Sequence, residues 1–283
     1  MQAFEEITPN PKIDFSAIKE AVKLFKNHAG TWILASFFIL LISLGYVFLM
    51  IPFNRVTHAS APTMPALLRL FLPSPTALMP RYPILIPIIL AFYITTIFFS
   101  AGLYRMATKQ VRGQSFSIRD LVRCDRGETI SLFIFSIAFW VYHTCIRLVN
   151  YHLWYQSTLH PHSPLLLSAF YFGFALQLLI FITVDALLLF TLPLIVDQQM
   201  NLIGAISKSF HTLKRQCLMA MLFYIVVRIF AVIGWLLCAI GILVAFPVVT
   251  LSVTILYRNF FIGSSSPPAP DKKLFEPAIP PGN

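Results

Sequence analysis

Six long apolar runs divide the chain, and the shorter segments between them contain most of its charged residues. A membrane-spanning helix needs about 20 mostly apolar residues. Runs of this kind predict spans at residues 32–52, 82–104, 130–149, 165–196, 217–238 and 242–262. The pattern therefore predicts an all-α fold, a polytopic transmembrane helical bundle of about six spans that occupies residues 1–263 as one membrane domain.

Two of these runs contain prolines that bear on the continuity of the helices. Pro87 is expected to kink the second span, because a proline inside a helix removes a backbone hydrogen bond. The fourth run is longer than one bilayer crossing requires, so we expect it to tilt or to break at Pro193. Only residues 239–241 separate the last two runs, which predicts a tight helical hairpin.

Two charged segments, 15–27 and 201–216, have the periodicity of amphipathic helices, and a shorter one at 117–123 begins with Ser117 and Asp120 spaced as a capping box. The apolar stripes consist of Ile18, Ala21, Val22 and Phe25 in the first segment and Ile203, Ile206, Phe210 and Leu213 in the second. The opposite faces carry the basic residues Lys19, Lys23, Lys26, Lys208, Lys214 and Arg215. Such cytoplasmic surface helices either lie flat on an anionic leaflet or pack on the ends of the spans, and the pattern fits both arrangements.

Each of these three segments precedes two spans, which indicates a plan of three units, each with one surface helix and two spans. The first and third surface helices also share letters, since an offset of 188 residues superposes Ala17 on Ala205 and Lys26 on Lys214. An internal repeat is one explanation, and chance similarity between basic amphipathic helices is the other.

Composition supports a membrane location, because 58% of the residues are hydrophobic and only 11% are charged, against about 25% in a typical soluble protein. The mean hydropathy is +0.77, the formal net charge is +10 and the isoelectric point is near 9.6. A basic chain can bind nucleic acid, but here the basic residues stand beside apolar runs, so membrane topology explains them better. We therefore expect membrane lipids with anionic headgroups as partners, together with a membrane-protein partner, and no nucleic acid.

The basic residues are distributed unevenly between the connecting segments. Sixteen of the 21 lysines and arginines fall before the first span, after the second, after the fourth, and in or after the last turn of the sixth. Because positively charged segments stay on the cytoplasmic side of a membrane, this distribution predicts that both termini are cytoplasmic. Residues 264–283 are rich in proline and serine, which predicts a disordered cytoplasmic tail.

Residues 190–216, FTLPLIVDQQMNLIGAISKSFHTLKRQ, resemble the hallmark segment of a poorly characterised bacterial membrane family, the YciC-like proteins. The matching features are Pro193 near the end of a span, then Asp197, and then an amphipathic helix that opens with Ala205 and Ile206. Looser matches are DFSAIKEAVKLFKNHAG at 14–30, LYRMATKQVRGQSFSIRDL with Gly113 before Phe116, and CAIGILVAFP at 238–247 followed by Tyr257 and Arg258.

The YciC-like family also resembles the membrane domain attached to some glycerophosphodiester phosphodiesterases. In those enzymes the chemistry belongs to a separate soluble domain, so the resemblance implies a topology rather than an activity. It places the chain among multi-pass proteins of the plasma membrane, the inner membrane of a bacterium.

Candidate catalytic and metal-binding groups are few. His152, His160 and His162 share one outer loop, in which a His-x-His pair with a third histidine is a candidate metal site. The loop contains no carboxylate or cysteine, so an interfacial loop anchored by Trp154 and Tyr155 explains it better. Phosphate-binding loops, nucleophile elbows and zinc-protease motifs are absent from the sequence. We expect no catalytic residue, no metal and no cofactor, and hence no enzyme.

Two residues of opposite charge lie inside neighbouring spans, Asp185 in the fourth and Arg228 in the fifth. Asp185 stands twelve residues before Asp197 and Arg228 twelve residues after Gln216, so straight helices would place both roughly 18 Å from the cytoplasmic ends. An unpaired charge near the bilayer centre costs at least about 2.5–3.5 kcal/mol. We therefore expect an intramembrane ion pair, which is either a structural lock or part of a gate or solute site.

Two classes of function remain. The first is a non-enzymatic integral membrane protein that scaffolds, assembles or regulates partners in the cell envelope. The second is a transporter or channel for a small solute or lipid. Transport usually needs several polar groups at mid-depth in the membrane, and the spans offer few beyond Asp185, Arg228 and Gln177, which favours the first class.

Overall fold

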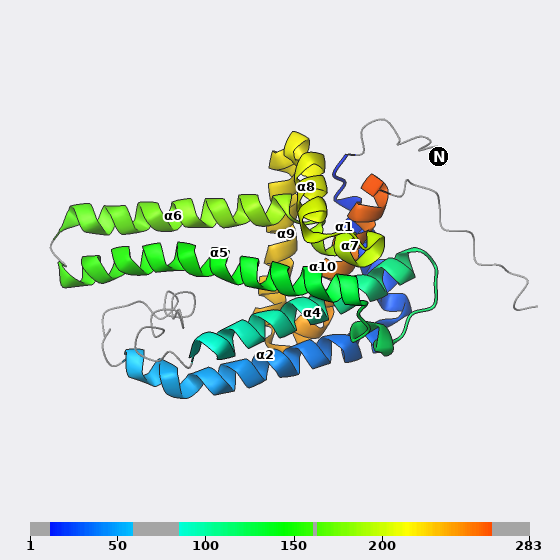
Figure 1. Cartoon of the computed structure of the whole chain (residues 1–283), viewed down its shortest axis with the longest axis horizontal. Coiled ribbons are helices and arrows are strands. Elements are labelled where there is room, and N and C mark those ends of the chain that lie inside the picture. The colour runs from blue at the N-terminus through cyan, green and yellow to red at the C-terminus, as the bar shows by residue number, and fades with distance from the viewer. Residues whose placement is uncertain (1–11, 59–84, 161–162, 262–283) are drawn as a thin grey trace, which may run out of the picture.

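The structure, a computed structural model of the chain, describes residues 12–58, 85–160 and 163–261, and every regular element in these ranges is a helix (Figure 1). Six helical stretches within them are long and apolar enough to cross a membrane. The prediction of an all-α fold with about six spans is confirmed, and the chain is a multi-pass helical membrane protein. The predicted tail at 264–283 and His162 lie outside the described residues.

Long and short helices alternate along the chain. The long helices are α2 (Ala29–His58), α4 (Leu85–Val111), α5 (Arg126–Leu159), α6 (Pro164–Leu187), α9 (Cys217–Leu236) and α10 (Cys238–Phe261). The short elements are α1 (Ser16–Asn27), α7 (Thr191–Gln198), α8 (Leu202–Leu213) and the 3-10 turns η2 (Ile118–Leu121) and η3 (Lys214–Gln216). The two amphipathic segments at 15–27 and 201–216 thus form helices, whereas 117–123 forms a single 3-10 turn.

The core of the molecule forms around α10. This helix packs against α1, α2, α4 and α9, and it contributes the fully buried side chains of Leu251, Ile255, Leu256 and Tyr257. A helix that is apolar on all sides is expected at the centre of a bundle, where every face meets a neighbour. Pro247 lies inside α10 and does not end the helix.

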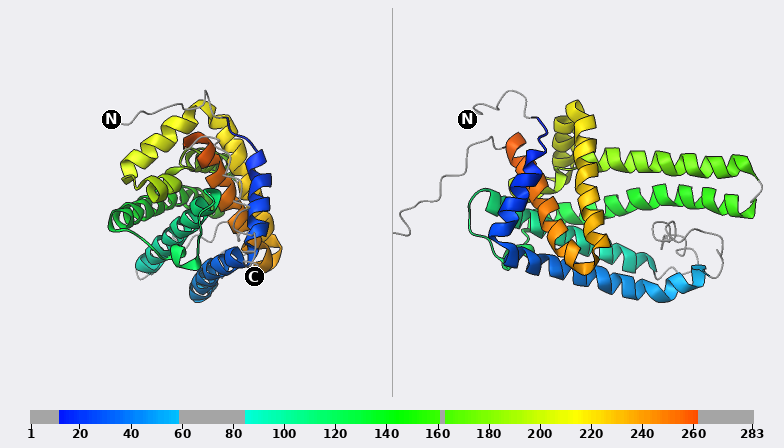
Figure 2. Two further views of the ribbon diagram at one scale, coloured as in Figure 1. Left: turned by 90° about the vertical axis from the view of Figure 1, so that its right-hand side faces the viewer. Right: turned by 180° about the vertical axis from the view of Figure 1, so that it is seen from behind.

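The long helices do not all run in the same direction. Helices α2, α4, α5 and α6 follow the long axis of the molecule, and the α5–α6 hairpin forms an arm that extends beyond α9 (Figure 1). Helix α9 instead runs across this axis, both in Figure 1 and in the view along the axis in Figure 2, and it packs against α6 and α10. The arm and the crossing helix meet where α6 ends.

The structure corrects the prediction for Pro193, which does not break the fourth run because it lies in the first turn of α7. Pro87 lies in the first turn of α4 as the structure describes it, from Leu85 onward. The first backbone N–H groups of a helix have no acceptor within the helix, so a proline there removes no hydrogen bond.

The fourth run breaks instead between α6 and α7, at residues 188–190. The hydroxyl of Ser209, on α8, donates to the carbonyl oxygen of Leu187 at 2.7 Å and accepts from the N–H of Phe190 at 3.2 Å. One buried serine therefore satisfies backbone groups on both sides of the break. No sequence pattern within the run itself signals this, because the partner lies on a different helix.

Helices α1 and α8 share a buried pattern as well as letters. The offset of 188 residues superposes the buried side chains of Ala17, Ala21 and Phe25 of α1 on Ala205, Ser209 and Leu213 of α8. The same offset superposes the first residues of α2 and α9, Ala29 and Cys217. The elements and their buried faces therefore agree with the internal repeat that the letters indicated.

The buried face of α8 differs from its predicted apolar stripe. Ile203 is 79% exposed and Phe210 is 43% exposed, whereas Ala205, Ser209 and Leu213 are fully buried. In this orientation of α8, Ser209 faces the break between α6 and α7 and forms the hydrogen bonds described above. The outer apolar edge of α8 remains free to enter a leaflet, while α1 covers its own apolar face by packing against α10.

Candidate functional site

The structure brings the predicted intramembrane pair together. Asp185 lies near the C-terminal end of α6 and Arg228 in the middle of α9, and Nη2 of Arg228 is 3.5 Å from Oδ2 of Asp185. Tyr224 stands between them: its hydroxyl donates to Oδ2 of Asp185 at 2.5 Å and accepts from Nε of Arg228 at 2.6 Å. The sequence analysis missed Tyr224, although its position four residues before Arg228 places both on one face of α9.

The pair forms for a different reason from the one the sequence suggested. The estimate of equal depth assumed one straight helix from Asp185 to Asp197, but α6 ends at Leu187 and α7 begins at Thr191. That premise is wrong. The two side chains meet because α9 crosses the end of α6 and packs against it.

Two further tyrosines interact electrostatically with this pair, Tyr104 on α4 with Arg228 and Tyr142 on α5 with Asp185. The side chain of Asp185 is only 8% exposed, whereas that of Arg228 is 59% exposed. The hydrogen bonds and the ion pair thus join α6 and α9, with the carboxylate buried and the guanidinium at the exposed side.

A second polar network joins three helices near the ends of α4 and α10. Asp197, on α7, accepts through Oδ2 from Nη2 of Arg112 and from the hydroxyl of Tyr257, both at 2.7 Å. Gln198 donates to the same tyrosine hydroxyl at 3.0 Å and accepts from Nζ of Lys208 at 2.8 Å. These contacts tie α7, α8, α10 and the residue that follows α4 together, and Oδ2 of Asp197 accepts two of the hydrogen bonds.

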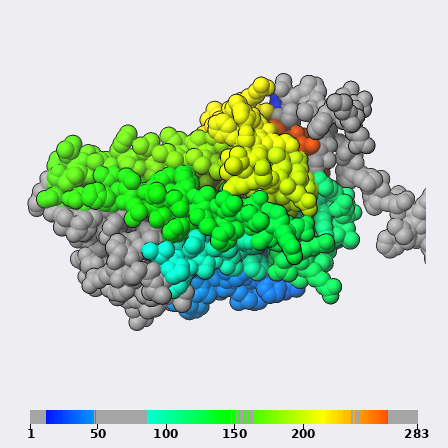
Figure 3. Space-filling view, in the orientation of Figure 1, coloured from blue at the N-terminus to red at the C-terminus, as the bar shows by residue number. Residues whose placement is uncertain are grey.

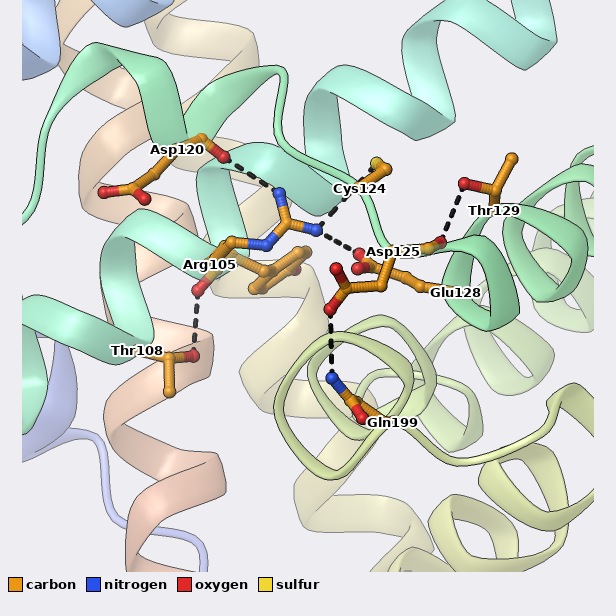
Figure 4. Close-up of polar contacts among 9 residues, drawn as sticks. Arg105, Thr108, Asp120, Cys124, Asp125, Glu128, Thr129 and Gln199 are labelled. Atoms are coloured by element: carbon orange, nitrogen blue, oxygen red, sulfur yellow. Dashed lines mark hydrogen bonds and ion pairs between the residues drawn. The ribbon is translucent and has the colours of Figure 1, made fainter.

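A third network fixes the connection between α4 and α5 (Figure 4). Arg105 donates through Nη1 to the carbonyl oxygen of Asp120 at 2.9 Å, and its Nη2 forms an ion pair with Glu128. The carboxylate of Asp120 accepts from Nζ of Lys109 at 2.6 Å and from the N–H of Ser117 at 2.9 Å. The latter contact belongs to the predicted capping box of Ser117 and Asp120, which the structure contains.

Burial alone would raise the pKa of Asp120, but the hydrogen bonds from Lys109 and Ser117 outweigh it and hold the pKa below its usual range. Asp120 is therefore a carboxylate at neutral pH, and its charge is used to hold η2 against α4.

Two additional contacts hold α1 in place. Arg258 of α10 forms an ion pair with Glu20 at 3.1 Å. Gln110 of α4 accepts from the indole N–H of Trp32 at 2.7 Å and donates to the carbonyl oxygen of Leu24 at 2.8 Å. The surface helix is thus fastened to the bundle by polar contacts as well as by its buried face.

The basic residues predicted to meet the membrane surface gather at one end of the molecule. We call this the basic end, and it comprises α1, α7, α8, η2, η3 and the C-terminal turns of α4 and α10 (Figures 1 and 2). All six predicted residues are exposed there, namely Lys19, Lys23, Lys26, Lys208, Lys214 and Arg215. Lys208 also lies 5.2 Å from the centroid of the Phe261 ring.

The histidines do not assemble a metal site in the part of the chain that the structure describes. His152 and His160 are both exposed at the far end of α5. No group of three or more histidine, cysteine or acidic side chains within metal-binding reach occurs among the described residues.

Comparison with known proteins identifies no relative of this chain. No family model matches the chain, and neither a curated protein nor a solved structure matches it.

Proposed function

We propose that this chain is a non-enzymatic, multi-pass protein of a bacterial inner membrane that holds or assembles partner proteins there. The observation that carries the proposal is the α5–α6 arm, which forms one edge of the molecule in Figure 3. Along α6, Phe172 is 72% exposed, and Leu176 and Leu179, one and two turns further on, are also exposed. An apolar helix face of this length is suited to packing against the transmembrane helix of another protein.

The interactions of the acidic residues support a scaffold role for the chain. Five of the seven acidic residues in the described ranges are in ion pairs with lysine or arginine, namely Glu20, Asp120, Glu128, Asp185 and Asp197. Four of these pairs join two different helices or a helix to η2, and the fifth joins α7 to Arg112, the residue after α4. Acids engaged in this way serve to fix the bundle, which favours a scaffold over a catalyst.

The resemblance to the YciC-like family is part of the proposal. Its motif residues lie close together in space, since Asp197 contacts Tyr257 and also Arg112, the neighbour of Gly113. Gly113 has a φ of +70°, a left-handed conformation that glycine adopts without strain. A structural reason for the motif thus supports the assignment to this family.

The proposed topology predicts the result of reporter fusions. Fusions at Asn10, Gly113 and Pro268 should give cytoplasmic activity, and a fusion at Gln156 should give activity on the outer side, because the basic end should face the cytoplasm. Green fluorescent protein and alkaline phosphatase, fused in parallel at each site, report opposite sides of the membrane. Phosphatase activity at Gly113 would contradict the orientation.

Site-specific cross-linking tests the scaffold role. A photoreactive amino acid at Phe172, Leu176 or Leu179 should link the full-length chain to the same membrane protein in native membranes, because these residues share one face of α6. Leu236, which is 76% exposed on α9, serves as the matched control and should give only lipid adducts. Lipid adducts alone at all four positions would contradict the proposal.

A transporter is the second candidate, and one observation favours it. The guanidinium group of Arg228 is exposed within an apolar helix, and charged groups inside membrane spans often mark a solute path. Proteoliposomes containing the full-length chain would then show a solute flux that depends on Arg228. Flux that persists in the Arg228→Gln variant would count against this second candidate.

A further inference from the structure

The guanidinium group of Arg228 is only partly satisfied by the described residues. Its Nε donates to Tyr224, but the 3.5 Å from Nη2 to Asp185 exceeds the roughly 2.7–2.9 Å of a charge-assisted hydrogen bond. Asp185 Oδ2 has a closer partner in the Tyr224 hydroxyl, at 2.5 Å. The Nη groups thus retain hydrogen atoms that no described acceptor takes at short range.

Tyr224 fixes the direction in which these free donors point. Its hydroxyl binds Nε, and its ring lies under the guanidinium, with Cζ of Arg228 4.8 Å from the ring centroid. A cation stacked on an aromatic face and bonded at one edge has little freedom to turn. One side of Nη2 faces Asp185, and the edge formed by Nη1 and the other side of Nη2 is left to point outward, in agreement with the 59% exposure of the side chain.

The surroundings of this edge are apolar. Ile229, Val232 and Ile233, which follow Arg228 on α9, are each about half exposed. A positive charge that faces such a surface inside a membrane is costly unless an anion accompanies it. An anion that carries its own apolar part satisfies both features, because its charge meets the guanidinium while its chains cover the neighbouring side chains.

We propose that Arg228 binds the oxyanion of a lipid headgroup, namely a phosphate group, through the paired donors of its Nη edge. Guanidinium groups bind phosphate with two parallel hydrogen bonds, a geometry that a lysine ammonium does not offer. Tyr224 acts as the positioning residue that holds the plane of the guanidinium. Asp185 keeps the arginine in place and competes with the lipid for it.

Native mass spectrometry of the purified full-length chain tests this site with defined lipids. Phosphatidylglycerol should bind, whereas diacylglycerol with the same acyl chains should bind far more weakly because it lacks the phosphate. The Arg228→Gln variant should lose affinity for phosphatidylglycerol by about tenfold or more, the effect of removing hydrogen bonds to a charged group. Arg228→Lys should lose part of this affinity, since it keeps the charge without the paired donors.

Removal of the competing carboxylate gives a test in the opposite direction. Asp185→Asn should tighten phosphatidylglycerol binding, and this result does not depend on whether Arg228→Gln gives folded protein. Arg126→Gln removes one exposed charge at the start of α5, outside the basic end, and is the matched control, with unchanged binding expected. The melting temperature of each variant reports whether it is folded.

Three results would overturn the proposal. The first is equal binding of phosphatidylglycerol and diacylglycerol. The second is unchanged phosphatidylglycerol binding in both Arg228→Lys and Asp185→Asn. The third is inorganic phosphate alone protecting the chain from thermal unfolding as well as the lipid does, which would assign the same donors to a free solute anion instead.

Discussion

Reversing either charge of the Asp185–Arg228 pair should sharply reduce the amount of folded protein, and exchanging both should restore much of it. Asp185→Arg places two guanidinium groups beside one tyrosine, and Arg228→Asp places two carboxylates there. Each single change leaves a like-charged pair in a site where Asp185 is 8% exposed. Breaking a fully buried ion pair costs about 3–5 kcal/mol. Because only Asp185 is buried here and Arg228 is 59% exposed, we expect the lower end of that range, still a large fraction of the stability of most proteins.

The double exchange should restore the amount of folded protein because the Tyr224 hydroxyl can bridge the two side chains in either arrangement. A tyrosine hydroxyl both donates and accepts, so Tyr224 can donate to a carboxylate on α9 and accept from a guanidinium on α6. The measurement is the monodisperse fraction of full-length protein in detergent, together with its melting temperature. Tyr224→Phe is the matched control: it removes only the bridging hydroxyl and should cost about 1–3 kcal/mol. A double variant as poor as the sum of the single variants would show that the pair does not stabilise the fold.

The Asp185–Arg228 pair is predictable from the sequence, but the two residues meet for a reason that the sequence does not contain. Charge inside an apolar run is costly, and that principle alone is enough to predict that Asp185 and Arg228 seek each other. The route by which they meet depends on the break at 188–190 and on the direction of α9, and both depend on contacts between separate helices. Periodicity describes one helix at a time and carries no information of this kind.

The surface helices α1 and α8 also show which features can be predicted from one helix alone and which depend on contacts between helices. Apolar periodicity located α1 and α8 closely, because 3.6-residue spacing is a local property of the chain. It failed to choose the buried face of α8, where small residues and Ser209 are buried while Ile203 and Phe210 are exposed. Hydropathy is a weak guide at a membrane surface, where apolar residues on the outer face can be covered by lipid instead of protein. The long-range polar contacts were missed for a related reason, since Trp32 and Gln110 are 78 positions apart and Arg112 and Asp197 are 85 positions apart.

Replacing Gly102 with alanine should destabilise the protein strongly. Gly102 lies on α4, and a Cβ atom there would be 2.0 Å from the carbonyl oxygen of Leu121 and 2.7 Å from its Cα. Both are backbone atoms of η2, so no side chain can rotate away and the turn itself has to move. That turn is held by the contacts of Asp120 with Lys109 and Arg105, which would be strained together.

Whether Gly102→Ala stabilises or destabilises the protein depends on two opposing contributions to the free energy of unfolding. Alanine in place of glycine inside a helix gains about 0.5–1 kcal/mol, because the unfolded chain is less free. Overpacking a core costs typically 1–3 kcal/mol and occasionally more, and a clash with backbone lies at the upper end of that range. Gly45 supplies the matched control, since it lies inside α2 with no atom within 4 Å of an added Cβ, and Gly45→Ala should stabilise.

The labelling rate of Cys124 can test whether Gly102→Ala displaces η2. Its Sγ lies 3.9 Å from Nη2 of Arg105, just beyond η2, and burial raises the pKa of this thiol, so it reacts slowly in the native protein. A displaced η2 should expose it. In a background where the other three cysteines are serine, maleimide should therefore label Cys124 faster in Gly102→Ala than in Gly45→Ala. Equal labelling rates and a melting temperature unchanged by Gly102→Ala would mean that α4 and η2 do not approach as closely as the structure places them.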